Sequence, residues 1–238
     1  MCTVVLLRRS GHAWPLLLAA NRDERTDRAW DPPAQFWPGV VGGKDRLGNG
    51  TWMALRGGVF AAVLNRPGSL GPLAGKRSRG ELPLLALEAG SAGGSAERLA
   101  GLDASEYRTF NLVVADRSEA YFVRGGGAGR PHVAALGPGI HVVTAHDPND
   151  PASPRARAYR PRFERAAPPD PERGDWREWM ALLSSRSGPR GAAINVPAEG
   201  GFGTVCSSLA GVSSEGRAVW LFAAGRPDVA PFQPLTLP

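Results

Sequence analysis

Cysteine, histidine and long apolar segments are all scarce in this chain. Its 238 residues include only two cysteines, Cys2 and Cys206, and four histidines. Two cysteines so far apart cannot supply the disulfide framework of a small secreted domain. No apolar run approaches the length of about 20 residues that a transmembrane helix requires. These shortages favour a cytoplasmic, reducing setting and predict no stable membrane insertion.

A cleaved signal peptide is not expected either, although the segment "RRSGHAWPLLLAANRDE" has the basic-then-apolar order typical of one. Its apolar stretch is short and contains Pro15, and another apolar run, Val4 to Leu7, precedes the basic residues. That arrangement differs from the order of regions in a secretory signal. We therefore expect this segment to belong to the fold.

The charge is positive, with a formal net value of +6, but it is not concentrated. The arginines are spread along the chain, and no basic stripe alternates with aromatic residues as in nucleic-acid-binding modules. No nucleic-acid partner is expected. A basic surface still favours anionic small molecules through its general field.

Several motifs that mark known chemistry are missing. The sequence has no P-loop, no dinucleotide fingerprint and no G-x-S-x-G elbow, and four histidines give a serine triad little support. His141, His146 and Asp147 lie close together, but their spacing matches no established metal motif. The sequence therefore predicts neither a metal site nor a cofactor.

The apolar runs and turn residues predict an antiparallel protein. Four hairpins are expected, in residues 2–21, 51–65, 110–125 and 208–225. Hairpins build antiparallel sheets rather than a doubly wound parallel sheet. Helices are expected over residues 78–90, 95–102, 153–166 and 175–185, with Pro161 kinking or ending the third. Together they predict an α+β fold, a four-layer αββα sandwich of two antiparallel sheets, as a single domain over residues 1–238.

The candidate site begins at Cys2. If Met1 is removed, Cys2 carries a thiol and a free α-amino group on the same carbon, which together form a nucleophile and its base. The first hairpin would bring Cys2 beside the polar residues Asn21, Arg22 and Asp23. A carboxylate there can orient the amine and influence its protonation. The alternative is that residues 21–24 form a solvated turn.

Two further apolar runs end in polar residues. Asn65 and Arg66 follow the apolar run 59–64, and the Asn65 amide can donate to a developing oxyanion. His146 follows the run 140–143 and is a candidate for substrate contact. The alternatives are an asparagine that caps a turn and a histidine in a structural hydrogen bond. Cys206 lies inside an apolar run and is expected to be a buried thiol.

These segments together resemble the NRDE family, the relatives of transport and Golgi organisation protein 2. The resemblance rests on "MCTVVLL", "LLAANRDE", "GNGTW", "AVLNRPG", "SRGEL", "FNLVVAD" and "GTVCSSLAGV" in consistent order along almost the whole chain. It implies an N-terminal-nucleophile hydrolase fold. Many of these relatives read Gly-Thr-Arg where this chain has Gly203, Thr204 and Val205.

A more distant resemblance concerns chemistry. Choloylglycine hydrolases and penicillin V acylases also begin Met-Cys-Thr and cleave amides with that cysteine. The resemblance implies Cys2 as nucleophile, Asp23 as the residue that orients its amine, and Asn65 as oxyanion donor. It implies substrate contacts for Asn21, Arg22, Arg66 and His146. The late arginine and second asparagine of those enzymes are not matched.

The expected function is therefore that of an N-terminal cysteine hydrolase that cleaves a non-peptide amide bond of a small acylated substrate. The alternative is a non-catalytic binding or trafficking protein for a lipid, acyl-CoA or haem-like ligand on the same fold. The hydrolase interpretation predicts that Cys2, Asp23 and Asn65 converge in one cleft. The partner is a small molecule in either case, and the sequence predicts no oligomeric state.

Overall fold

The computed structural model describes residues 2–237, so the predicted removal of Met1 concerns a residue outside this range. The chain forms two compact units. Residues 2–28 and 138–237 make up unit 1, and residues 29–137 make up unit 2. Each unit contains its own antiparallel sheet and its own helices.

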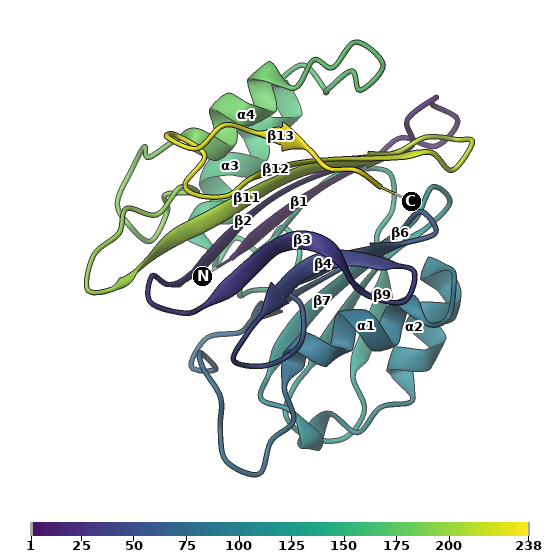
Figure 1. The fold of residues 1–238 in the computed structure, drawn as a ribbon, viewed down its shortest axis with the longest axis vertical. Coiled ribbons are helices and arrows are strands. Elements are labelled where there is room, and N and C mark those ends of the chain that lie inside the picture. The colour runs from purple at the N-terminus through teal and green to yellow at the C-terminus, as the bar shows by residue number, and fades with distance from the viewer. Residues whose placement is uncertain (1, 238) are drawn as a thin grey trace. The chain divides into compact units, whose positions relative to one another are not determined.

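Unit 1 is built on a six-stranded sheet in the order β10-β1-β2-β11-β12-β13. Figure 1 labels β1, β2, β11, β12 and β13 of this sheet. Every neighbouring pair is antiparallel. The strands are β1 (Thr3–Arg8), β2 (Leu16–Arg25), β10 (Gly139–Val143), β11 (Phe202–Val212), β12 (Ala218–Ala223) and β13 (Gln233–Pro234). The first predicted hairpin is thus present, and β11 lies on the other side of β2.

Two helices, α3 (Pro154–Arg165) and α4 (Arg177–Ser184), pack on this sheet. The side chain of Ser153 caps α3 by accepting a hydrogen bond from the Ala156 N–H at 3.2 Å. Pro161 lies inside α3, so the prediction that it could end the helix is wrong. Trp179 and Leu183 of α4 join a core with residues of β1, β2 and β11.

Unit 2 is built on a seven-stranded antiparallel sheet in the order β3-β4-β5-β6-β7-β8-β9. The strands are β3 (Trp30–Trp37), β4 (Val40–Asp45), β5 (Met53–Arg56), β6 (Val59–Asn65), β7 (Phe110–Ala115), β8 (Ala120–Gly125) and β9 (His132–Ala135). The helices are α1 (Leu82–Leu87) and α2 (Ala92–Ala100), with the 3₁₀ turns η1 (Arg79–Glu81) and η2 (Ala104–Glu106). Gly57 and Gly58, with φ of 53° and 80°, form the predicted turn between β5 and β6.

The predicted α+β fold of two antiparallel sheets with helices is confirmed. Two details of the sequence analysis need correction. First, β3 was not predicted, because Pro32 and Pro33 interrupt it and proline is tolerated only at a sheet edge, where β3 lies. Second, β2 does not end before the polar residues but continues to Arg25. The single domain over residues 1–238 stays a prediction.

Candidate active site

The predicted site residues 21–23 lie within β2, between two other strands. Asn21 is in register with Thr3 of β1 on one side and with Ser207 of β11 on the other. Cys2 immediately precedes β1, so the hairpin brings it to the level of Arg22, as the sequence predicted. The three residues are almost fully buried, with exposures of 1%, 5% and 1%, which excludes the solvated-turn alternative.

Alternation along the strands assigns these side chains to two faces of the sheet. The Asn21 amide donates to the carbonyls of Leu183 and Ile194, both at 3.0 Å, so it faces α4 and the segment after it. Asp23 shares that face, and Arg22 points to the opposite one. Thr3 also faces the helices, because its hydroxyl contacts Arg155 of α3, so Cys2 lies on the face of Arg22.

A buried polar cluster surrounds Asp23 on the helix face. One carboxylate oxygen, Oδ1, accepts from the Thr204 hydroxyl at 2.7 Å. The other, Oδ2, accepts from Nη1 of Arg155 at 2.9 Å, and the same nitrogen donates to the Thr3 hydroxyl at 2.7 Å. The Thr204 hydroxyl also accepts from the Val196 N–H at 2.8 Å. The carboxylate is thus held from β11 and α3, while Thr3 of β1 fixes the guanidinium of Arg155.

The chain makes room for Thr204 with a bulge. Thr204 is opposite Asp23 but Cys206 is opposite Arg22, so one extra residue, Val205, is inserted into β11. A β-bulge re-aims the side chains on either side of it. Here it allows Thr204 to reach Asp23 while Ser207 stays in register with Asn21, whose amide oxygen accepts from the Ser207 hydroxyl at 2.5 Å.

The two thiols differ in their surroundings. The Cys2 thiol is half-buried and donates to the Asp23 carbonyl at 3.5 Å. Burial, reinforced by the negative charge of Asp23, raises its pKa. Cys206 is buried, and burial raises the pKa of its thiol to about 12. Cys206 is therefore the buried thiol that the sequence predicted.

His146 lies in the turn between β10 and α3. Val143 at the end of β10 is in register with Val4 of β1, so this turn begins beside the start of β1. The His146 backbone N–H donates to the Thr144 hydroxyl at 3.3 Å, and its Nδ1 is 3.7 Å from Asp150 Oδ2. His146 thus lies at the end of the sheet where Cys2 lies.

Asn65 and Arg66 lie in unit 2, and their convergence with Cys2 stays a prediction. Asn65 is the last residue of β6 and is partly exposed. It shares the strand face of Ala61 and Val63, which contact the helix-side core of unit 2. Arg66 donates from Nη1 to the Asn111 amide oxygen at 2.6 Å, and its backbone N–H donates to the Ser69 hydroxyl.

Arg155 is the main residue that the sequence analysis missed. It lies in a predicted helix without a predicted role, yet the residue is only 5% exposed. A signal for it was present in the sequence. Arg155 precedes Tyr159 and Phe163 by four and eight residues, so it occupies the buried face of α3, where an arginine is unusual.

No group of three or more His, Cys, Asp or Glu that could hold a metal ion occurs among residues 2–237. In the same part of the chain, no helix is long and apolar enough to cross a membrane.

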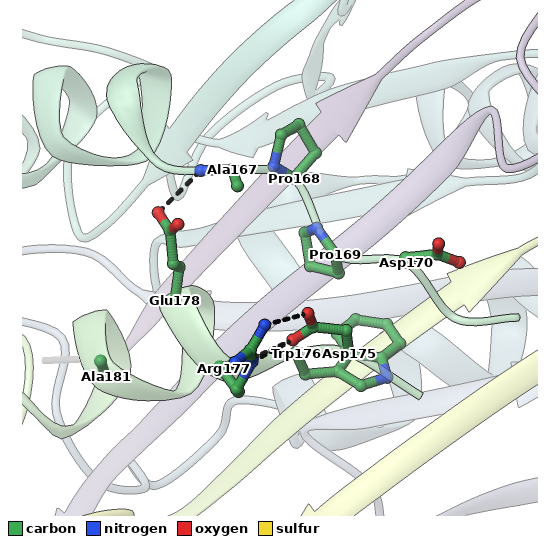
Figure 2. Close-up of a pocket in the computed structure, with 9 residues that line it drawn as sticks. All are labelled: Ala167, Pro168, Pro169, Asp170, Asp175, Trp176, Arg177, Glu178 and Ala181. Carbon is green, nitrogen blue, oxygen red and sulfur yellow. Dashed lines mark hydrogen bonds and ion pairs between the residues drawn. The ribbon is translucent and has the colours of Figure 1, made fainter. Parts of the chain in front are cut away.

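A separate hollow of about 370 Å³ lies in unit 1 beside α4 (Figure 2). Its carboxylates bond within the protein. Asp175 pairs with Arg177 at 2.8 Å, and Glu178 accepts from the Ala167 N–H at 2.7 Å, as Figure 2 shows. Asp170 accepts from the Glu172 N–H at 3.1 Å. None of the predicted site residues lines this hollow, and we assign it no role.

Comparison with known proteins gives a family and a fold. Residues 1–221 match the family described as Transport and Golgi organisation 2. A search of curated proteins found no match to the chain. Among solved structures, the chain is similar to a Caenorhabditis elegans N-acylethanolamine-hydrolyzing acid amidase ortholog, at 14% identity with a TM-score of 0.52. The likeness covers 87% of this chain and 92% of that one, and at this identity it shows a shared fold.

Proposed function

The chain belongs to the Transport and Golgi organisation 2 family, and on that premise we propose that it is an N-terminal cysteine hydrolase. The proposed reaction is cleavage of a non-peptide amide C–N bond in a small acylated substrate, after removal of Met1. The resemblance to the NRDE family and to the N-terminal-nucleophile hydrolase fold is confirmed. The reaction and the nucleophile are proposals.

One observation carries this proposal. A half-buried thiol stands at the start of the first strand, bonded to the backbone of Asp23, whose carboxylate is itself held by two other elements. A buried, hydrogen-bonded carboxylate gives little net stability compared with apolar residues, so packing alone does not explain one next to Cys2. The amidase named among the similar structures supports the same reaction class.

The proposed reaction has two stages, formation of a thioester on Cys2 and hydrolysis of that thioester. The freed α-amino group of Cys2 takes the thiol proton, and the sulfur attacks the amide carbonyl carbon. The C–N bond breaks, the leaving amine takes the proton from the ammonium group, and a thioester remains on Cys2. The α-amino group of Cys2 then takes a proton from a water molecule, and the resulting hydroxide attacks the thioester. The thiolate that leaves takes the proton back from the ammonium group. The products are a carboxylic acid and the restored thiol.

Maturation matters for this chemistry because burial raises the pKa of the Cys2 thiol. A protonated amine on the same residue would lower that pKa, since an adjacent positive charge favours the thiolate. Removal of Met1 therefore supplies both the base and a more reactive thiol.

The remaining roles follow from position. We assign Asp23 to orient the amine, because its carboxylate is held next to Cys2. Arg22 lies on the thiol's side of the sheet, so it is assigned to the substrate, together with Arg66 and His146. The Asn21 amide donates to Leu183 of α4 and to Ile194 beyond that helix, so its contribution to substrate binding would come through the position it fixes. Asn65 as oxyanion donor is the assignment that the strand alternation supports least.

A cytoplasmic setting is part of the proposal. Both cysteines are free thiols. Cys2 and Cys206 flank Arg22 across three adjacent strands, a separation of about 9–10 Å between backbones. A disulfide requires its two Cα atoms within about 7 Å, so these two thiols cannot pair without movement of the sheet.

The proposal is tested with a panel of N-acyl amides and acyl thioesters. The purified protein is incubated with each compound, and the N-terminal peptide is searched by mass spectrometry for an acyl adduct. We expect an acyl group on Cys2 and release of the amine. Turnover without modification of that peptide would contradict the proposed nucleophile.

The alternative is a non-catalytic protein that binds or carries a lipid, acyl-CoA or haem-like ligand. The raised pKa of the Cys2 thiol favours it if Met1 is retained, because the thiol then lacks its base. Saturable binding of such a ligand, with neither turnover nor an adduct on Cys2, would support this alternative.

A further inference from the structure

Arg155 is a charged side chain in a position that packing alone would give to an apolar one. It extends from the first turn of α3, next to the Ser153 cap, and points at the sheet between Thr3 and Asp23. Its side chain is 6% exposed, and that of Asp23 is fully buried. The two therefore form a buried ion pair, with Nη1 of Arg155 2.9 Å from Oδ2 of Asp23.

Contacts at the start of α3 fix the position of Arg155. The Ser153 hydroxyl, which caps α3, also bonds the Thr144 hydroxyl at 3.0 Å, so the start of the helix is tied to the end of β10. That end of β10 lies beside the start of β1. The packing of α3 on the sheet therefore places the Arg155 guanidinium against Thr3, the residue after Cys2.

We propose that Arg155 is a positioning residue for Cys2: it holds the Asp23 carboxylate in place and offsets the negative charge of that carboxylate beside the thiol. This inference rests on the proposed function only in so far as Cys2 is taken to be the nucleophile. The effect on the thiol itself exists whether or not the protein turns over a substrate.

The charges around Cys2 set the direction of the effect. On β2, Asp23 and Glu24 are negative and disfavour a thiolate at Cys2. Arg22, also on β2, is positive, and Cys206 on β11 is a neutral thiol at physiological pH. Arg155 on α3 is the positive group bonded to Asp23. Without Arg155, the negative charge of Asp23 at Cys2 is less fully offset, so both the thiol and a freed amine bind protons more tightly.

The test is the pH dependence of iodoacetamide labelling at Cys2, followed by peptide mapping so that Cys206 is scored separately. In Arg155→Gln we expect the labelling midpoint at Cys2 to rise by about one pH unit. Arg155→Lys keeps the charge and should label close to wild type. Arg157→Gln, an exposed change on the same helix, is the matched control and should leave the midpoint unchanged.

A double-mutant cycle tests whether the effect passes through Asp23. In an Asp23→Asn background, Arg155→Gln should no longer move the midpoint. A midpoint unchanged in folded Arg155→Gln would overturn the inference, and so would an equal shift in both backgrounds. If Arg155→Gln does not fold, Asp23→Asn is compared with Asp23→Asn/Arg155→Met, because neutral replacement of a buried pair is often tolerated. A difference between those two midpoints would overturn it.

The labelling experiment is separate from the test of function because it needs no substrate. A shifted midpoint in a protein that hydrolyses nothing on the panel leaves this inference standing and contradicts the hydrolase. Hydrolysis with an unshifted midpoint would support the hydrolase and overturn the role proposed for Arg155.

Discussion

Unit 1 and unit 2 use the same architecture but bury different side chains beneath their helices. In unit 2 the interface between α1, α2 and the sheet is a cluster of aliphatic and aromatic residues. In unit 1 a similar apolar cluster covers most of the sheet, but one end carries Asp23, Arg155 and their hydroxyl partners. The buried charged residues of the described chain, Arg22, Asp23 and Arg155, all belong to unit 1.

The difference separates what the fold needs from what the site needs. Unit 2 shows that this arrangement of helices on a sheet packs well without any buried charge. A buried ion pair gives little or no net stability compared with apolar residues of the same volume. The polar end of unit 1 is therefore better explained by chemistry at Cys2 than by stability.

The largest expected effect is on activity, at Cys2. Cys2→Ser should lose nearly all turnover of any amide substrate found, because the hydroxyl is a much weaker nucleophile, yet it should fold normally. Cys206→Ser is the matched control, since Cys206 lies in the same sheet but is buried, and burial raises the pKa of its thiol. It should keep the turnover of its folded fraction. Full activity in Cys2→Ser would remove the nucleophile from the account.

The next effect is on stability, and it compares two aspartates of one segment. Asp23→Ala should lower the free energy of unfolding by about 3–5 kcal/mol, because it leaves Arg155 buried without this carboxylate. Asp27 pairs with Arg25 on the surface, so Asp27→Ala should leave stability unchanged within error. Urea denaturation of both variants measures this. Equal stability in the two would show that the polar cluster is not a buried network.

Asn65 tests whether unit 2 contributes to the chemistry. If its amide donates to the oxyanion, Asn65→Ala should fold and lose roughly a hundredfold in turnover. If it only caps the turn after β6, stability should fall by about 1 kcal/mol with the rate almost unchanged. Kinetics and melting temperature together distinguish the two, and wild-type rates would restrict the site to unit 1.

The smallest expected effect is at His146. If His146 orients the substrate, His146→Ala should raise KM more than it lowers kcat, because the lost contact binds the substrate and takes no part in the chemical step. His132→Ala, an exposed change in β9 of unit 2, is the control and should alter neither constant. An unchanged KM in His146→Ala would limit His146 to its turn.

The strand pairing at the start of unit 1 could be predicted from the sequence, although the end of β2 could not. Pairing of the first hairpin could be inferred from two apolar runs and a short turn, and that pairing was enough to bring Cys2 beside residues 21–23. The burial of those residues could not be inferred from the sequence, because Asn-Arg-Asp-Glu has the composition of a solvated turn. Their burial depends on β11, whose neighbour β2 is about 180 residues earlier in the chain, and such pairings leave no local pattern.

Arg155 shows a different limit. Its position on the buried face of α3 was visible in the spacing with Tyr159 and Phe163, but the spacing does not say what an arginine there would meet. Its partners come from β1 and β2, more than 130 residues away. Asn65 shows the converse, since its strand and turn were predicted correctly while its role still depends on the arrangement of two units.

The central claim is that Cys2 becomes the N-terminal residue and acts as the nucleophile, and an intact mass of the purified protein tests it most directly. The account predicts a chain lighter than the full sequence by one methionine residue, with the N-terminal peptide beginning at Cys2. A chain that keeps Met1 would have no free amine on Cys2 to act as the base, and that result would contradict the hydrolase mechanism.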